Sequence, residues 1–195
     1  ARVFKRGVIP LISPQVPFHL RETRERAGYV CGASIEIAAR LAQDGLVKAL
    51  VTGPIDKYRL NLGGFDFPGH TEMLASLCGA RHVSMMLAND HLRVTLVTTH
   101  QPLSRVSELV TPAAIERAVD HTIAALQKWW KIANPRIAVC GLNPHAGDSG
   151  LLGREESKTI APTVRSLQKK YPRCEITGPL AADTLFALHA VRSPK

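Results

Sequence analysis

The chain has 195 residues, of which 45% are hydrophobic and only 5% aromatic, so its core is expected to rest on Ala, Val, Leu and Ile. Such a core suits buried parallel strands under helices better than a β-sandwich. The net charge of +9 is scattered and forms no basic block with interleaved aromatic residues. This distribution argues against a dedicated nucleic-acid binder and favours an anionic small substrate or a dinucleotide.

The hydropathy and the cysteine pattern of the sequence both predict a cytoplasmic protein. No apolar run approaches the roughly 20 residues that a membrane-spanning helix needs, and the sequence shows no N-terminal signal pattern. Four cysteines occur without a CxxC pair, which predicts buried free thiols rather than a structural zinc site. We therefore expect a soluble cytoplasmic protein that binds neither membrane nor nucleic acid.

The first third of the chain predicts an arm, a helix, a strand and a short helix. Residues 1–26 contain three prolines and a charged stretch, and we expect an irregular arm or a truncated start there. Apolar residues at helical spacing predict a helix over residues 27–44. The apolar run LVKALVTG (46–53) predicts a buried strand followed by a turn, and DKYRLNLGG (56–64) predicts a short helix that ends at its glycine pair.

The segment FDFPGHTEMLASLCG (65–79) places His70 and Thr71 at a junction between a loop and a helix. Thr71 is suited to cap this helix, whose backbone N–H groups would then face an anion. Two strand-like runs follow, VSMMLA (83–88) and LRVTLVTTH (92–100). The Asn-Asp pair between them predicts a hairpin turn.

The rest of the chain alternates between helices and strands. Thr111 followed by proline predicts the start of a long helix. We expect strands at RIAVCGLN (136–143) and CEITGPL (174–180), and helices over residues 154–170 and 181–188. The paired glutamates that open the first of these helices suit the helix dipole. This order predicts a layered α/β/α fold with a mostly parallel sheet.

Four loops follow strands and carry polar side chains that are suited to chemistry. They are TGPIDK, TTHQPL, GLNPHAGDSG and TGPLAADT, which hold Lys57, His100, His145 and Asp183. Ligands of open α/β sheets bind beyond the carboxyl ends of the strands, where such loops meet. The sequence contains no GxGxxG, Walker or GxSxG motif.

Each of these residues also has a simpler interpretation. A lone histidine after a strand is usually a surface or capping residue, and the two histidines are not spaced as a metal-binding pair on one helix. Lys57 fits an ordinary lysine at a helix start, and Asp183 fits a helix cap. Residue types and spacing alone therefore leave the site open.

The loop motifs taken together resemble one enzyme family. VTGPIDKYRLN, FPGHTEMLA, LRVTLVTTHQPL, CGLNPHAGDSGLLGREE and TGPLAADTLF occur in this order. The combination, from about residue 27 to 186, resembles the 4-hydroxythreonine-4-phosphate dehydrogenases of vitamin B6 synthesis. The resemblance implies a fold like that of isocitrate and isopropylmalate dehydrogenases, incomplete at both ends, with residues 27–195 as a partial α/β dehydrogenase unit.

The resemblance also implies an activity and its cofactors. It implies oxidation of 4-phosphooxy-L-threonine by NAD or NADP, followed by loss of CO2. In this family three histidines hold a divalent metal, which could be Zn, Co, Mn or Mg. The first two match His100 and His145, and the third belongs to a YHDQG-like motif that this sequence does not contain.

Further roles follow from the same motif matches. His70 and Thr71 match the pair that contacts the phosphorylated substrate, and Lys57 matches the lysine of the VTGPxxK turn. Asp183 matches an acidic residue that reaches the neighbouring subunit's site, so we expect a homodimer with its site at the interface. Lys57 and Asp183 are thus the catalytic candidates.

Three other functions stay open at this point. One is a related dehydrogenase of erythronate or threonate 4-phosphate, which shares these motifs. A second is a truncated, non-catalytic homologue that acts as a binding module, which the missing third histidine favours. A basic nucleic-acid binder is the third.

Overall fold

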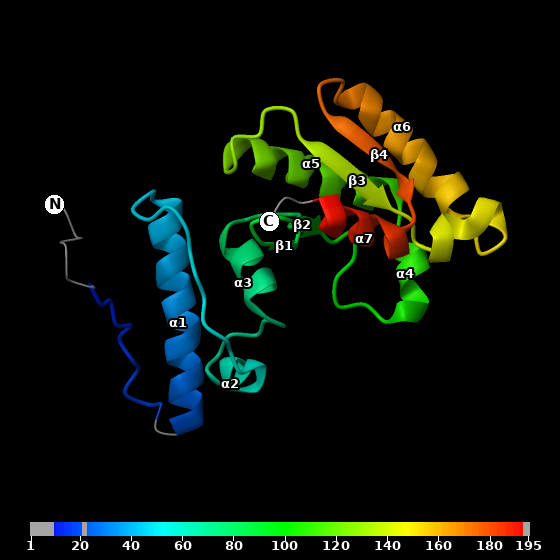
Figure 1. Ribbon diagram of the computed structural model, residues 1–195. Coiled ribbons are helices and arrows are strands. Elements are labelled where there is room, and N and C mark those ends of the chain that lie inside the picture. The colour runs from blue at the N-terminus through cyan, green and yellow to red at the C-terminus, as the bar shows by residue number, and fades with distance from the viewer. Residues whose placement is uncertain (1–9, 21–22, 193–195) are drawn as a thin grey trace. The chain divides into compact units, whose positions relative to one another are not determined.

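A computed structural model of the chain describes residues 10–20 and 23–192 (Figure 1). The chain forms two compact units, Ala1–Val83 and Ser84–Lys195. The expected boundary between residues 26 and 27 stays a prediction. The expected arm over residues 1–26 stays a prediction, because residues 1–9 and 21–22 lie outside the described part.

The described residues of the first unit form three helices: α1 (Thr23–Gln43), α2 (Lys57–Leu62) and α3 (His70–Leu77). Glycines let α1 approach its neighbours closely, because a Cβ on Gly28 would collide with the backbone of Arg59 in α2. Leu60 and Met73 are fully buried between the helices. The helices expected in this region are therefore confirmed, and α1 begins four residues earlier than its apolar pattern indicated.

The strand expected over residues 46–53 is not formed, and that prediction is wrong. Residues 44–56 belong to neither a helix nor a strand, and Val51 is 93% exposed. A buried parallel strand needs partners for its N–H and C=O groups on both sides. The described residues of this unit form no sheet that could supply them.

The second unit opens with the predicted hairpin. β1 (Met86–Ala88) pairs antiparallel with β2 (Arg93–Thr95). The Asn89 side chain shapes the turn, since its Oδ1 accepts hydrogen bonds from the backbone N–H groups of His91 and Leu92. This confirms the Asn-Asp turn predicted between the two runs.

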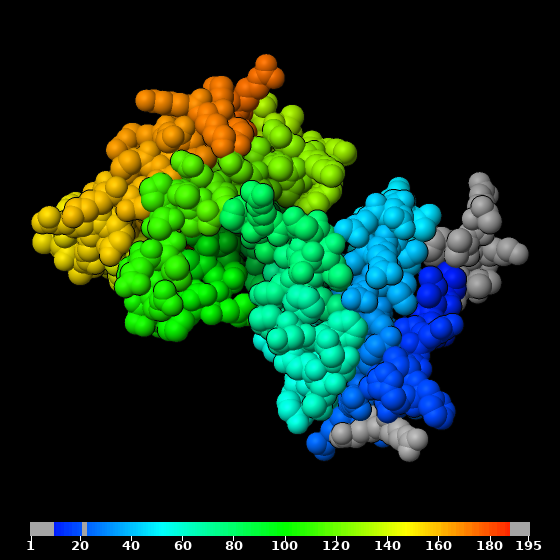
Figure 2. Space-filling model, turned by 180° about the vertical axis from the view of Figure 1, so that it is seen from behind, coloured from blue at the N-terminus to red at the C-terminus, as the bar shows by residue number. Residues whose placement is uncertain are grey.

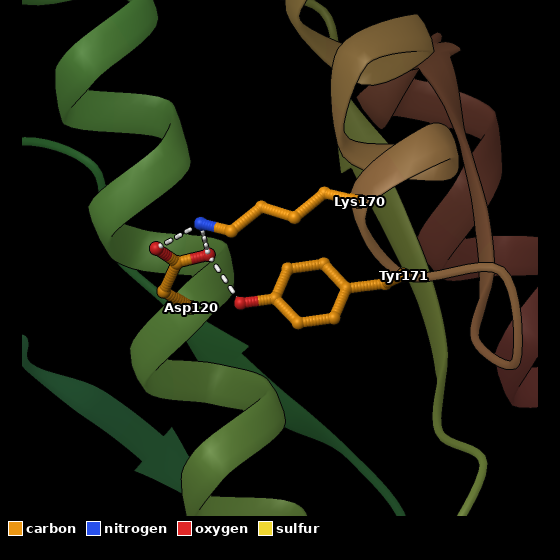
Figure 3. A network of polar contacts seen from close by, with 3 residues as sticks. All are labelled: Asp120, Lys170 and Tyr171. Carbon is orange, nitrogen blue, oxygen red and sulfur yellow. Dashed lines mark hydrogen bonds and ion pairs between the residues drawn. The ribbon is translucent and has the colours of Figure 1, made fainter.

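Two helices follow the hairpin, α4 (Leu103–Leu109) and α5 (Pro112–Lys128). Thr111 caps α5 as expected, because its Oγ1 accepts a hydrogen bond from the N–H of Ala114 at 3.3 Å. Farther along, Asp120 ties α5 to the end of α6 (Ala161–Lys170). Its carboxylate accepts hydrogen bonds from Lys170 Nζ and Tyr171 Oη, both at 2.7 Å (Figure 3).

The parallel strand pair forms the centre of this unit. β3 (Arg136–Cys140) pairs in parallel with β4 (Glu175–Leu180). The connection runs through a helical loop, η1 (Pro144–Gly150), a π-helical turn, η2 (Glu156–Ile160), and α6; helix α7 (Ala182–Arg192) follows β4. The core joins α5, η2, α6 and β4 through Ile115, Val119, Ile123, Ile160, Val164, Leu167 and Ile176.

The fold class is thus α/β, with helices around a parallel strand pair. The expectation of one mostly parallel sheet is met only in part, because the described residues form a parallel pair and a separate antiparallel hairpin. None of the helices in the described ranges has the length and apolar character to cross a membrane.

Candidate functional site in the second unit

The loop after β3 has an unusual backbone. Five consecutive residues, His145 to Ser149, have φ values between 42° and 82°, in the left-handed region. Four of them are not glycine, and the left-handed helical conformation costs roughly 1–2 kcal/mol for each such residue. A run of this kind persists only where surrounding contacts hold it, and such strain gathers at functional sites. Figure 2 shows the chain around residue 150, in yellow, at an outer edge of this unit.

A buried carboxylate holds the start of this loop. Glu156 is only 5% exposed, and its Oε1 accepts hydrogen bonds from the backbone N–H groups of Leu142 and Asn143 at 2.8 and 2.7 Å. Its Oε2 accepts a third from Asn143 Nδ2 at 3.0 Å. Burial acts to raise the pKa of Glu156, but the hydrogen bonds from Asn143 and Leu142 outweigh it and lower this pKa. The side chain is therefore an anion at neutral pH.

The neighbouring Glu155 adds a second anchor. Its Oε2 accepts hydrogen bonds from Asn143 Nδ2 and from the backbone N–H of Arg154, both at 2.9 Å. The hydrogen bond from Asn143 lowers the pKa of Glu155. The sequence interpretation of these two glutamates as favourable charges at a helix start missed this function. The available signal was their place directly after a glycine-rich loop that follows a strand.

The structure brings two predicted site residues together. His145 Nδ1 lies 2.8 Å from Asp183 Oδ2, with 69% and 44% of the side chains exposed. A carboxylate at this distance favours the proton on Nδ1 and leaves the Nε2 lone pair free. Histidines that bind metals usually have such a partner. The pair therefore suits a metal ligand or a proton acceptor at Nε2.

The sequence also fits Asp183 to a helix cap. The structure places it inside the first turn of α7, which begins at Ala182. Its Oδ1 accepts a hydrogen bond from the N–H of the next residue, Thr184, at 3.1 Å. Asp183 thus contacts both the start of α7 and the imidazole of His145.

His100 lies between β2 and α4 and is exposed. Its φ of 55° is left-handed, as in the His145 loop. Within the described residues, no three His, Cys, Asp or Glu side chains are grouped as a metal site would require. The donor chemistry of His145 fits a metal ligand, but the described part of the chain does not complete a coordination shell.

This unit also contains an apolar cavity of about 560 Å³. It lies among β2, α5, β3 and α7, with Val94, Ala118, Val139 and Leu185 among its lining residues. Its size is in the range of small-molecule pockets. Its lining does not include His100, His145 or Asp183.

Candidate residues in the first unit

The other three candidates lie in the first unit. Lys57 opens α2, which is capped by Asp56 through a hydrogen bond from the N–H of Arg59. His70 opens α3, and its cap is Gly69 without a side-chain hydrogen bond. The expectation that Thr71 caps this helix is therefore wrong, since Thr71 lies one residue inside it.

Lys57 lies close to the start of α3. A Cβ placed on Gly69 would be 3.9 Å from Lys57 Cε and 3.4 Å from Glu72 Oε2. Lys57, His70 and Thr71 thus belong to one neighbourhood of this unit. A lysine next to free N–H groups at a helix start offers positive charge to an anion.

Relatives of the chain

The fold and the loops define an α/β protein with an oriented histidine beyond the end of a parallel strand. Comparison with known proteins shows which family this α/β protein belongs to. The model of the family described as pyridoxal phosphate biosynthetic protein PdxA matches residues 3–193. The chain belongs to this family.

Curated relatives include two bacterial 4-hydroxythreonine-4-phosphate dehydrogenases. The protein from Marinobacter nauticus is 47% identical over 156 residues, which are 80% of this chain and 46% of that protein. The protein from Pseudomonas syringae pv. tomato is 50% identical over 143 residues, which are 73% of this chain and 43% of that protein. The chain thus spans about half the length of the curated relatives that it matches.

Solved structures agree with these matches. A 4-hydroxythreonine-4-phosphate dehydrogenase from Burkholderia phymatum is 42% identical with a TM-score of 0.77, covering 90% of this chain and 53% of that one. The enzyme from Klebsiella pneumoniae is 36% identical with a TM-score of 0.81, covering 89% and 52%. A terephthalate 1,2-cis-dihydrodiol dehydrogenase from Burkholderia xenovorans is 29% identical with a TM-score of 0.67, covering 89% and 56%.

Proposed function

We propose that the chain is part of a metal-dependent 4-hydroxythreonine-4-phosphate dehydrogenase, which oxidises and decarboxylates 4-phosphooxy-L-threonine in vitamin B6 synthesis. The observation that carries this proposal is the oriented pair of His145 and Asp183 in a chain that belongs to the PdxA family. The oxidant is NAD or NADP. The working protein is a cytoplasmic homodimer, and its complete polypeptide has the layered fold of isocitrate and isopropylmalate dehydrogenases.

In this proposal, His100 and His145 are two protein ligands of one divalent metal, which is Zn, Co, Mn or Mg. His100 and His145 are both exposed and follow strands of the second unit. The backbone of each has a φ in the left-handed region. Asp183 holds the His145 ring through Nδ1, so Nε2 would be the atom offered to the metal. A third ligand comes from outside the described residues.

When bound, the metal would supply Lewis acidity at the substrate hydroxyl, and a nicotinamide cofactor would supply the oxidising power. The chain's own residues orient the substrate and manage charge. His70 and Thr71 direct hydrogen bonds to substrate oxygens, and Lys57 holds anionic oxygens or a proton close to them. Its position next to Gly69 supports a shared role with this pair.

The relative from Burkholderia xenovorans has the same fold and, by its name, acts on a dihydrodiol. The fold therefore does not decide the alcohol, and dehydrogenases of erythronate or threonate 4-phosphate stay as an alternative. Turnover of the intact protein on 4-phosphooxy-L-threonine, measured beside threonate 4-phosphate, decides between them.

A non-catalytic binding module is the second alternative. It is favoured by the finding that the described residues complete no metal site. Titration of the purified chain with NAD and with zinc separates the two functions, because a module of this kind would bind neither.

The metal assignment is tested by replacing one ligand. We expect His145→Ala to lose most of the bound metal and of the turnover, measured by metal analysis and steady-state kinetics on the intact protein. The matched control is His82→Ala, which removes an exposed histidine outside the proposed site. Full metal content and unchanged turnover in His145→Ala would contradict the proposal.

A further inference from the structure

We infer that Glu156 is the positioning residue of the His145 loop: its buried carboxylate holds the loop backbone and so determines where His145 presents its imidazole. The inference rests on the proposed function in naming a metal as the ligand of His145. The contacts of Glu156 with the loop do not depend on that function.

The carboxylate uses both oxygens on the loop. Oε1 accepts two hydrogen bonds from successive backbone N–H groups, those of Leu142 and Asn143, directly after the end of β3. Oε2 accepts a hydrogen bond from the Asn143 side chain. At this point the chain leaves the strand, and its part-buried N–H groups need an acceptor from elsewhere. Glu156 supplies that acceptor from η2.

The loop also leaves room for this carboxylate from two directions. A Cβ on Gly141 would be 3.2 Å from Glu156 Oε1, and a Cβ on Gly147 would be 2.6 Å from Oε2. The segments before and after His145 therefore both contact the carboxylate. The backbone before residue 145 is thus held by hydrogen bonds to Glu156, and the backbone after it packs against the same side chain.

The path from Glu156 to His145 is short and stiff. Asn143, whose N–H is held by Glu156, is followed by Pro144, which has a restricted φ and also restricts the residue before it. His145 comes next, with its ring held by Asp183 at 2.8 Å. Glu156 thus fixes the backbone of this histidine while Asp183 fixes its ring.

Replacement of the carboxylate by an amide tests the inference. Glu156→Gln keeps the size of the side chain but removes the anion that accepts three hydrogen bonds. The matched control is Glu108→Gln, which removes an exposed glutamate from the same unit. Two quantities are measured in the intact protein: zinc affinity, by competition with a chromophoric chelator, and the ¹⁵N chemical shifts of the His145 imidazole without zinc.

We expect Glu156→Gln to bind zinc about 10- to 100-fold more weakly, as found when groups that orient ligands are removed. The imidazole shifts should move toward the average of the two tautomers, because the ring leaves Asp183 for part of the time. Glu108→Gln should change neither quantity. A folded Glu156→Gln protein with the zinc affinity and imidazole shifts of the wild type would overturn the inference.

Two further measurements keep the inference testable. If Glu156→Gln does not fold, hydrogen exchange of the Leu142 and Asn143 amides is measured in the wild-type protein. Protection of these amides supports the positioning role of Glu156, and exchange at the rate of free amides overturns it. If His145→Ala binds zinc as tightly as the wild type, the metal assignment fails. The imidazole shifts in Glu156→Gln then decide the positioning role alone.

Discussion

Replacing Gly147 by alanine should destabilise the second unit through its contact with Glu156. Gly147 is buried and has a φ of 82°, and a Cβ there would be 2.6 Å from Glu156 Oε2. Gly150 offers a matched control in the same loop. Its φ is 97°, but its Cβ would meet nothing closer than Arg154 Cγ at 4.0 Å.

The expected magnitudes follow from these surroundings. Left-handed backbone costs alanine roughly 1–2 kcal/mol at either position. At Gly147 the carboxylate must also retreat, and it cannot do so without weakening hydrogen bonds that it accepts as an anion. Such bonds contribute about 1.5–3 kcal/mol each. We therefore expect Gly147→Ala to lower the free energy of unfolding by about 3–5 kcal/mol and Gly150→Ala by about 1–2 kcal/mol.

Urea unfolding followed by tryptophan fluorescence measures this difference. Both tryptophans of the chain, Trp129 and Trp130, belong to the second unit, so the signal reports its unfolding. With a urea dependence of about 1–3 kcal/mol per molar for a unit of this size, an extra 2 kcal/mol moves the midpoint by roughly 1 M. Equal midpoints for the two variants would refute the view that a rigid carboxylate fills the space next to Gly147.

Two further predictions use the same fluorescence assay. Thr111→Ala removes the cap of α5, whose Oγ1 accepts a hydrogen bond from the N–H of Ala114, and should lower the free energy of unfolding by about 1 kcal/mol. Thr111→Ser keeps the hydroxyl and should retain most of the stability of the wild type. Equal losses in the two variants would contradict the capping role. The hydrogen bond to Asp120 raises the pKa of Lys170, and burial together with Asp120 raises that of Tyr171. Because folding favours both protonated forms, their contribution to stability is complete below about pH 10 and is lost as pH rises through the raised values. Asp120→Asn should reduce the stability that is lost at alkaline pH. An unchanged dependence of stability on pH would contradict the role of Asp120 in raising these two pKa values.

Local signals in the sequence were enough to predict most elements of the second unit. The Asn-Asp turn, the Thr-Pro helix start and the two apolar runs of β3 and β4 each carry their own hydrogen-bonding or steric preference. The strand expected over residues 46–53 failed for the opposite reason. A buried strand is stabilised by neighbours, and apolar residues alone do not show whether neighbours are present.

For the candidate site, the sequence predicts the residues but not their contacts. Loop positions after strands, together with the ordered motifs of a known family, predict His100, His145 and Asp183 as site residues from the sequence alone. They did not indicate that Asp183 contacts the ring of His145, nor that Glu156 turns inward to accept three hydrogen bonds. These contacts join positions 13 to 38 residues apart, so no local pattern encodes them.

By itself, the sequence determined the residue types of the site, the helices and turns with strong local preferences, and the family to which the chain belongs. Only the tertiary structure decided which side chains meet, which carboxylate is buried, and that the His145 loop is left-handed over five residues. The physical reason is that a strained backbone and a buried anion are unfavourable alone. The fold brings the hydrogen-bond donors of Leu142 and Asn143 to the anion, and it packs the left-handed loop against the same carboxylate at Gly147.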